Sequence, residues 1–143
     1  MARFVRDLLQ KKGDAVFSVA PGDSVRSAIE QMAERGVGAL LVMEGERLVG
    51  IVSERDYARQ VILKGRSSQD TPVADIMSSR VVCVHPERTI EECMALMTDR
   101  RIRHLPVVAD DRVTGVISIG DVVSAVIAEK EFQIKQLESY ISG

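Results

Sequence analysis

The sequence predicts an α+β fold in which two pseudo-symmetric β-α-β-β-α repeats pack through their sheets into one module. The first observation is a repeated segment, because residues 50–56 (GIVSERD) return as residues 115–121 (GVISIGD), an offset of 65. The second is that each half alternates apolar runs typical of strands with apolar residues at the three- and four-residue spacing of a helix. A single repeat has one apolar sheet face to cover, so we expect the two copies to share a core.

The repeat also defines the expected boundaries. The offset of 65 relates Pro21 to Pro86 and runs on without interruption to the repeated segment. Upstream, residues 5–9 (VRDLL) match residues 73–77 (VADIM) at an offset of 68, so the first copy has about three extra residues near 11–14. The expected divisions are a first repeat, a polar linker, a second repeat and a C-terminal helical extension, at 5–65, 66–72, 73–128 and 129–143.

Each repeat is expected to begin with a short strand rich in β-branched residues, at Ala15–Val19 and at Arg80–Val84. A turn containing proline follows, and then an amphipathic helix. The apolar face of this helix is expected to use equivalent residues in the two copies: Val25, Ala28, Ile29 and Met32, then Ile90, Cys93, Met94 and Met97.

Two further strands complete each predicted sheet. Apolar runs predict buried strands at Ala39–Met43 and Leu105–Val108. Tight polar turns join these to second strands at Leu48–Val52 and Val113–Ile117. A closing helix then starts near the aspartate that ends each repeated segment. The second closing helix is predicted to run through Ser142, because apolar residues keep near-heptad spacing on either side of a single lysine: Val123, Ile127, Lys130, Ile134, Leu137 and Ile141.

Composition limits the classes of function. The chain has 143 residues and a formal net charge of −2, without the concentrated basic surface that nucleic-acid binding requires. Its most apolar window, residues 122–128, is far shorter than a membrane helix. Cys83 and Cys93 show no metal-ligand spacing, so no metal site is expected. The charged start lacks the apolar stretch of a secretory signal, and we expect a cytoplasmic protein that contacts neither nucleic acid nor membrane.

The motif Ser-x-x-Asp closes both repeats, as Ser53 with Asp56 and as Ser118 with Asp121. One interpretation is structural, since a serine at a helix N-cap with an acid three residues later resembles a capping box, worth about 1 kcal/mol. The other is functional. A carboxylate can accept hydrogen bonds from the two hydroxyls of a ribose, and a serine hydroxyl with free backbone N–H groups suits a phosphate. Recurrence of the motif in both copies favours ligand binding.

Catalytic motifs are absent from the sequence. It has no Gly-x-x-x-x-Gly-Lys-Ser/Thr loop, and Gly36-x-Gly38 lacks the third glycine of a dinucleotide fingerprint. The two histidines form no nucleophile–base–orienter set. We therefore expect a protein that is not an enzyme and has no catalytic cofactor.

These motifs together resemble the CBS-domain family in its paired arrangement, over residues 5–128. Residues 73–77 (VADIM) are similar to the family's leading segment, and residues 103–108 (RHLPVV) to its second-strand signature, which residues 37–42 (VGALLV) of the first copy lack. The resemblance implies that ribose and phosphate are held by one copy while the adenine pocket comes largely from the other.

The resemblance also implies roles for individual residues. Ser118 and Asp121 would hold ribose and phosphate over a base pocket formed by Phe17, Val37 and Ala39. The mirror site would combine Ser53 and Asp56 with Val82, Ile102 and the backbone around His104. Family members often reach phosphates from the positions of Arg103 and His104, for which the alternatives are a surface arginine and a hydrogen-bonded, partly buried histidine. Arg55 is a further phosphate candidate, with a solvated arginine as its alternative.

The expected function is a regulatory sensor that binds an adenosine nucleotide in clefts between the repeats and signals to an unknown protein in trans. AMP, ADP and ATP are the expected ligands, with NAD and S-adenosylmethionine as further candidates. CBS pairs commonly associate as flat homodimers through their helices, so the resemblance also implies a homodimer. The alternative is a ligand-free scaffold in which the two aspartates only cap helices.

Overall fold

The computed structural model describes residues 2–142, and their contacts divide the chain into two compact units. The contiguous unit consists of Val16–Val82. The split unit combines the residues up to Ala15 with those from Cys83 onward. Within residues 2–142, no helix has the length and apolarity needed to cross a membrane.

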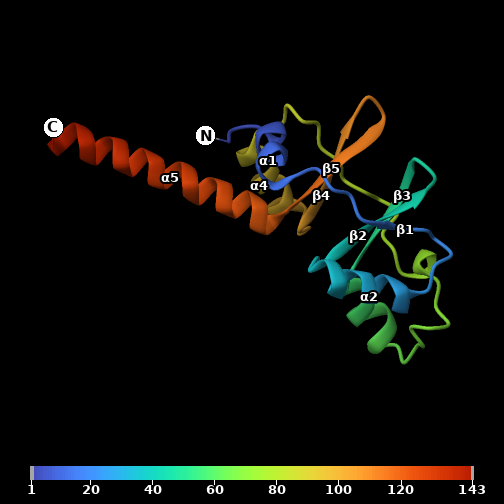
Figure 1. The fold of residues 1–143 in the computed structure, drawn as a ribbon. Helices are drawn as coiled ribbons and strands as arrows, with labels where there is room; N and C mark the ends of the chain where they lie inside the picture. The colour runs from blue at the N-terminus through green and yellow to red at the C-terminus, as the bar shows by residue number, and fades with distance from the viewer. Residues whose placement is uncertain (1, 143) are drawn as a thin grey trace. The chain divides into compact units, whose positions relative to one another are not determined.

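The contiguous unit holds a three-stranded sheet of order β1-β2-β3, in which β1 runs parallel and β3 antiparallel to the central β2 (Figure 1). The helix α2 has its apolar face buried, as predicted, with Ile29 half-buried at its margin. The predicted closing helix is a single α-turn, α3, that widens into a π-helical turn, η1. The elements are β1 (Ser18–Val19), α2 (Val25–Arg35), β2 (Ala39–Glu44), β3 (Arg47–Ser53), α3 (Glu54–Tyr57), η1 (Ala58–Ile62) and a 3₁₀ turn η2 (Val73–Asp75).

The described residues of the split unit form an antiparallel pair of strands, β4 and β5, and three helices. The short α1 and the amphipathic α4 both pack against α5, whose C-terminal half extends away from the rest of the unit (Figure 1). The predicted continuation of this helix through Ser142 is confirmed. The elements are α1 (Val5–Lys12), α4 (Ile90–Arg100), β4 (His104–Ala109), β5 (Arg112–Ser118) and α5 (Ile119–Ser142).

Irregularities of the two hairpins repeat at the predicted offset. The pairing of β2 with β3 shifts register between Val42 and Met43, and that of β4 with β5 shifts between Val107 and Val108. The helix that follows each hairpin is tied back in the same way, by Glu54 N–H donating to Gly38 O (3.0 Å) and Ile119 N–H donating to Arg103 O (2.8 Å). The repeat therefore extends to backbone detail, and the α+β class with two repeats is confirmed.

The predicted strand at Arg80–Val84 is wrong, since only Val84 forms a bridge, parallel to Val107. Its counterpart in the first repeat is also shorter than Ala15–Val19. The cause in the second repeat is Pro106, which occupies the position of Leu41. Leu41 N–H donates to the carbonyl of Phe17 (3.2 Å), whereas a proline has no N–H to donate at that point of the ladder.

The leading segments of the two repeats are exchanged between the units. Leu9, from the start of the chain, lies over Gly115 in the split unit. Met77, at the position equivalent to Leu9, lies over Gly50 in the contiguous unit. The split unit therefore combines the hairpin of the second repeat with the leading segment of the first. The contiguous unit combines the hairpin of the first repeat with the leading segment of the second.

The polar segment expected to link the repeats packs within the contiguous unit. The carbonyl of Thr71 accepts from Val25 N–H (2.9 Å) and that of Ser68 accepts from Arg26 N–H (2.9 Å), so both satisfy the first turn of α2. Thr71 is buried, and its hydroxyl donates to Ser67 O (2.6 Å). These bonds hold the segment against the start of α2.

Candidate functional site

In the contiguous unit, the Ser-x-x-Asp motif lies where β3 passes into α3. The Asp56 carboxylate accepts hydrogen bonds at Oδ2 from the backbone N–H of Ser53 (2.8 Å) and from its hydroxyl (3.0 Å). The Asp56 N–H donates in return to Ser53 Oγ (3.2 Å). The capping box that the sequence suggested is therefore formed, and both side chains are half-buried.

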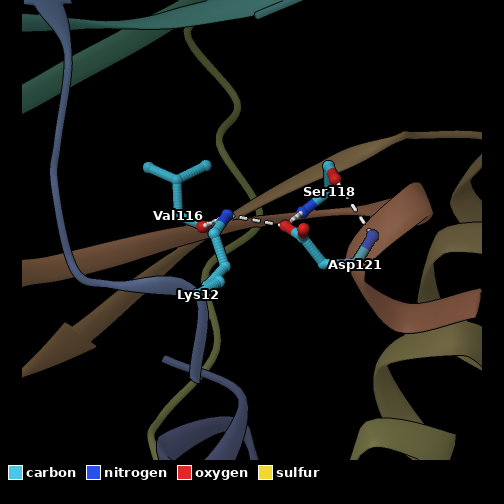
Figure 2. A network of polar contacts seen from close by, with 4 residues as sticks. All are labelled: Lys12, Val116, Ser118 and Asp121. Carbon is cyan, nitrogen blue, oxygen red and sulfur yellow. Dashed lines mark hydrogen bonds and ion pairs between the residues drawn. The ribbon is translucent and has the colours of Figure 1, made fainter. Parts of the chain in front are cut away.

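The equivalent motif in the split unit has the same backbone geometry and one additional partner. Ser118 N–H donates to Asp121 Oδ2 (2.8 Å), and Asp121 N–H donates to Ser118 Oγ (3.2 Å). The ammonium of Lys12, at the end of α1, lies 2.6 Å from the same Oδ2 and also donates to the carbonyl of Val116 (2.8 Å) (Figure 2). Asp121 therefore caps α5 and also forms an ion pair with Lys12 of the same chain.

These contacts determine the ionisation of Asp121. Partial burial alone would raise the pKa of this carboxyl group. The Lys12 ammonium, through its hydrogen bond and its charge, and the hydrogen bonds from Ser118 outweigh burial, so the pKa of Asp121 lies below its ordinary value. The Asp121 carboxylate is consequently ionised at neutral pH and is already paired with the Lys12 ammonium.

Each motif stands beside the first residue of the neighbouring strand. Ala39 is paired with Ser53, and His104 with Ser118, at the ends of the two hairpins. Arg103 supplies the carbonyl that holds the start of α5, and its own residue is exposed, while His104 is half-buried. Within each unit, the structure therefore gathers the serine, the aspartate and the strand start that the sequence singled out.

The remaining predicted residues lie in more ordinary surroundings. Phe17 and Val37 are partly buried and pack against the core of the contiguous unit, with the Arg35 guanidinium 4.6 Å above the centre of the Phe17 ring. Val82 and Ile102 are half-buried, and Arg55 is exposed at the first turn of α3. Their roles toward a base or a phosphate stay predictions.

A cavity of about 280 Å³ adjoins Asp121 in the split unit, between α1 and α5. Leu8 and Ala128 contribute apolar walls, while Lys11, Lys12 and Ser124 bring hydrogen-bond donors beside the carboxylate. Sequence reasoning missed Lys12, because the residue lies 109 positions from Asp121 along the chain. The one signal available was the basic pair Lys11-Lys12, which follows shortly after residues 5–9, the segment that resembles residues 73–77.

Among residues 2–142, no group of three or more His, Cys, Asp or Glu side chains is arranged to hold a metal ion. The thiol of Cys93 is buried in the core, and this burial raises its pKa to about 11. Cys83, in contrast, is exposed.

Two equivalent hairpins, each ending in a carboxylate at a helix entrance, define a tandem-repeat module with a paired polar site. The profile of the CBS domain matches residues 5–62 and again residues 73–128. The chain therefore belongs to the CBS-domain family, and it contains a tandem pair of these domains.

Curated and solved relatives agree with this assignment. The mitochondrial CBS domain-containing protein CBSX3 of Arabidopsis thaliana is 40% identical, over 97% of this chain and 72% of its own length. The structure of the CBS-domain containing protein ATU1752 from Agrobacterium tumefaciens is 38% identical with a TM-score of 0.84, covering 87% of this chain and 94% of that one. A hexameric CBS-CP12 protein from bloom-forming cyanobacteria is 27% identical with a TM-score of 0.75, covering 86% and 71%.

Proposed function

We propose that this CBS pair is a non-catalytic regulatory module that binds adenosine-containing ligands, with Asp56 and Asp121 each accepting hydrogen bonds from a ribose. The observation that supports the proposal most is the repetition of one geometry. In both units a half-buried carboxylate at the end of a hairpin receives its capping hydrogen bond at Oδ2. A carboxylate has about four acceptor positions, so capping leaves capacity for a ribose diol.

Membership of the CBS-domain family supports adenosine compounds as the ligand class. AMP, ADP and ATP are the first candidates, and NAD and S-adenosylmethionine carry the same adenosine group. Nearby donors suit the charged part of these ligands. Arg103 precedes β4 and His104 begins it, while Arg55 lies in the first turn of α3. Phe17, Val37 and Ala39, with Val82 and Ile102, are the proposed contacts of the base.

Isothermal titration calorimetry of the full chain tests this proposal. We expect binding of AMP or ATP with a stoichiometry that falls when Asp56→Asn or Asp121→Asn is introduced, and 2′-deoxy analogues that bind at least about tenfold more weakly, a loss of about 1.4 kcal/mol. Asp99→Asn is the matched control, because Asp99 has an 80% exposed side chain on α4. If no adenosine compound binds the wild type, the ligand-free scaffold replaces the proposal.

We propose that the bound state is transmitted to a separate protein in trans, in the cytoplasm. The free thiols of Cys83 and Cys93 support a reducing compartment. A sensor of this kind makes and breaks no bond in its ligand. Incubation with each nucleotide followed by chromatography checks this point, and the appearance of a product would contradict the non-catalytic assignment.

We further propose that α5 pairs with the same helix of a second copy. Its outward apolar residues are open to solvent, with Ile127 52%, Ile134 54% and Leu137 62% exposed. With Val123 and Ile141 they follow the alternating four- and three-residue spacing of a coiled-coil seam, interrupted by Lys130. An exposed seam of this length is typical of a protein–protein contact.

Lys130 indicates the direction of this pairing. In a parallel, in-register pair the two Lys130 ammonium groups would face each other within the seam, and such a like-charge contact is destabilising. Antiparallel pairing sets Lys130 opposite an apolar partner residue and brings its ammonium near Glu131 and Glu138, which flank the seam. A second copy in antiparallel orientation is therefore the proposed occupant of this face.

A further inference from the structure

The Lys12–Asp121 ion pair joins residues 109 positions apart and is held on two sides. The Lys12 ammonium contacts Asp121 Oδ2 at 2.6 Å and Val116 O at 2.8 Å, and the two side chains are 34% and 24% exposed. A freely solvated surface pair would sample many geometries. Here the hydrogen bond to the carbonyl of Val116 holds the ammonium beside the Asp121 carboxylate, the group proposed to bind a ribose (Figure 2).

The contact with Lys12 distinguishes the surroundings of Asp121 from those described for Asp56. Lys12 lies in the stretch of about three extra residues near 11–14, and continuing the offset of 68 as far as Lys12 would place the exposed Arg80 at the corresponding position. The Asp56 carboxylate accepts from the N–H and the hydroxyl of Ser53, whereas Asp121 is also bonded by Lys12. The two carboxylates share their capping geometry and differ in this cation.

Resting on the proposed function, we infer that Lys12 is a specificity-determining residue that makes the Asp121 site select phosphorylated adenosine ligands over the uncharged nucleoside. A ribose that donates to Asp121 has to share the carboxylate with the ammonium or displace it. Adenosine offers Lys12 no anionic group in exchange, so part of the ion pair is lost on binding. A nucleotide offers a phosphate oxygen, and the ammonium keeps an anionic partner throughout.

The cavity beside the pair supports the exchange. Its volume of about 280 Å³ gives the ammonium space to turn away from Asp121, and Lys11 and Ser124 add further donors there. Of its lining residues within the described chain, Asp121 is the one acid, against two lysines. Counting Lys12 itself, the charged residues of the lining sum to +1, which favours an incoming phosphate.

The test compares adenosine with AMP in calorimetric titrations of the full chain carrying Asp56→Asn, so that the Asp121 site alone is observed. With Lys12 present, we expect AMP to bind at least about tenfold more tightly than adenosine. In Lys12→Met the ratio should fall to within about twofold, with adenosine binding more tightly than before. Lys12→Arg keeps the positive charge and should retain the preference for AMP. Lys135→Met, on the exposed end of α5, is the control and should leave the ratio unchanged.

The ratio of two ligands on one protein sample is independent of how much of that sample is folded. An unchanged ratio in Lys12→Met, or adenosine binding as tightly as AMP when Lys12 is present, would overturn the inference while both ligands still bind and the proposed function stands. Failure of both ligands to bind the wild type would instead remove the proposed function, and this inference with it.

Discussion

The side chain of Leu9 lies so close over Gly115 that a Cβ atom added to the glycine would stand 2.7 Å from Leu9 Cδ2. Met77 has the same relation to Gly50, where an added Cβ would stand 2.6 Å from Met77 Sδ and 2.9 Å from the carbonyl oxygen of Ser78. Glycine is needed at both positions for close approach, because a leading segment crosses the strand there.

We predict that Gly50→Ala destabilises the protein more than Gly115→Ala does. At Gly115 the obstacle is the end of a flexible leucine, which can change rotamer. At Gly50 it includes the Ser78 backbone, held by two hydrogen bonds with Ile51 (2.9 and 3.0 Å). Overpacking of this kind costs about 1–3 kcal/mol, and we expect Gly50→Ala near the upper end by urea unfolding.

A double-mutant cycle provides the control for this prediction. Leu9→Ala should recover most of the loss in Gly115→Ala, since it removes the contacted atoms. If the changes in free energy of unfolding caused by the two substitutions were additive, Leu9 and Gly115 would not be in the close contact described here.

Acid should weaken the protein partly through Asp121. Its pKa is lowered in the folded state, so the stabilisation is present above the ordinary value of about 3.9 and is lost as pH falls through the folded value. In Lys12→Met the folded pKa moves back upward. We therefore expect wild type to exceed Lys12→Met in free energy of unfolding at pH 6, by at most about 1 kcal/mol for a partly exposed pair. The difference should shrink toward pH 3, and a difference that grows on acidification would refute the assignment.

The two thiols should react at very different rates. Cys83 is exposed, whereas burial of Cys93 raises its pKa to about 11, leaving about one thiolate in a thousand at pH 8. We expect a colorimetric thiol reagent to modify one thiol quickly and the second only when the protein unfolds. Cys83→Ser should abolish the fast phase, and its persistence in that variant would contradict the burial of Cys93.

Pairing of α5 predicts a dimer in analytical ultracentrifugation that Ile134→Glu converts to monomer, because the substitution places a charge within the apolar seam. Gln136→Glu adds the same charge off the seam and should leave the dimer intact. A wild-type monomer, or an unchanged dimer in Ile134→Glu, would exclude this face as the contact.

Local pattern was sufficient to predict much of the fold. The apolar runs that became β2 to β5 were located to within one or two residues, because buried strands and their polar turns are encoded within a few positions. The length of the first strand of the second repeat was overestimated. Val81 and Val82 favour a strand, but Pro106, which lies outside this segment in sequence, has no N–H to donate to it. The widening of α3 into a π-helical turn has no residue signature that we could have used.

The candidate site likewise has residues that could be predicted from local sequence and one that could not. Ser53 with Asp56, and Ser118 with Asp121, were recognised because each motif is contained in four residues. Lys12 was missed because its role depends on which unit α1 joins, and this follows from packing of Leu9 on Gly115 instead of from any local pattern. Contacts between distant segments are determined by tertiary packing, which one sequence does not display.

The exchange of leading segments has a consequence for biosynthesis. Once residue 82 has left the ribosome, the contiguous unit has its full set of elements, whereas α1 must wait for strands and helices made later. During that interval Val5 and Leu8, both buried in the finished protein, lack their partners. The contact of Lys12 with Asp121 spans 109 positions, and the entropy cost of closing a loop rises only slowly with its length. The helix α1 therefore completes its packing only after the segments from Cys83 onward have been made.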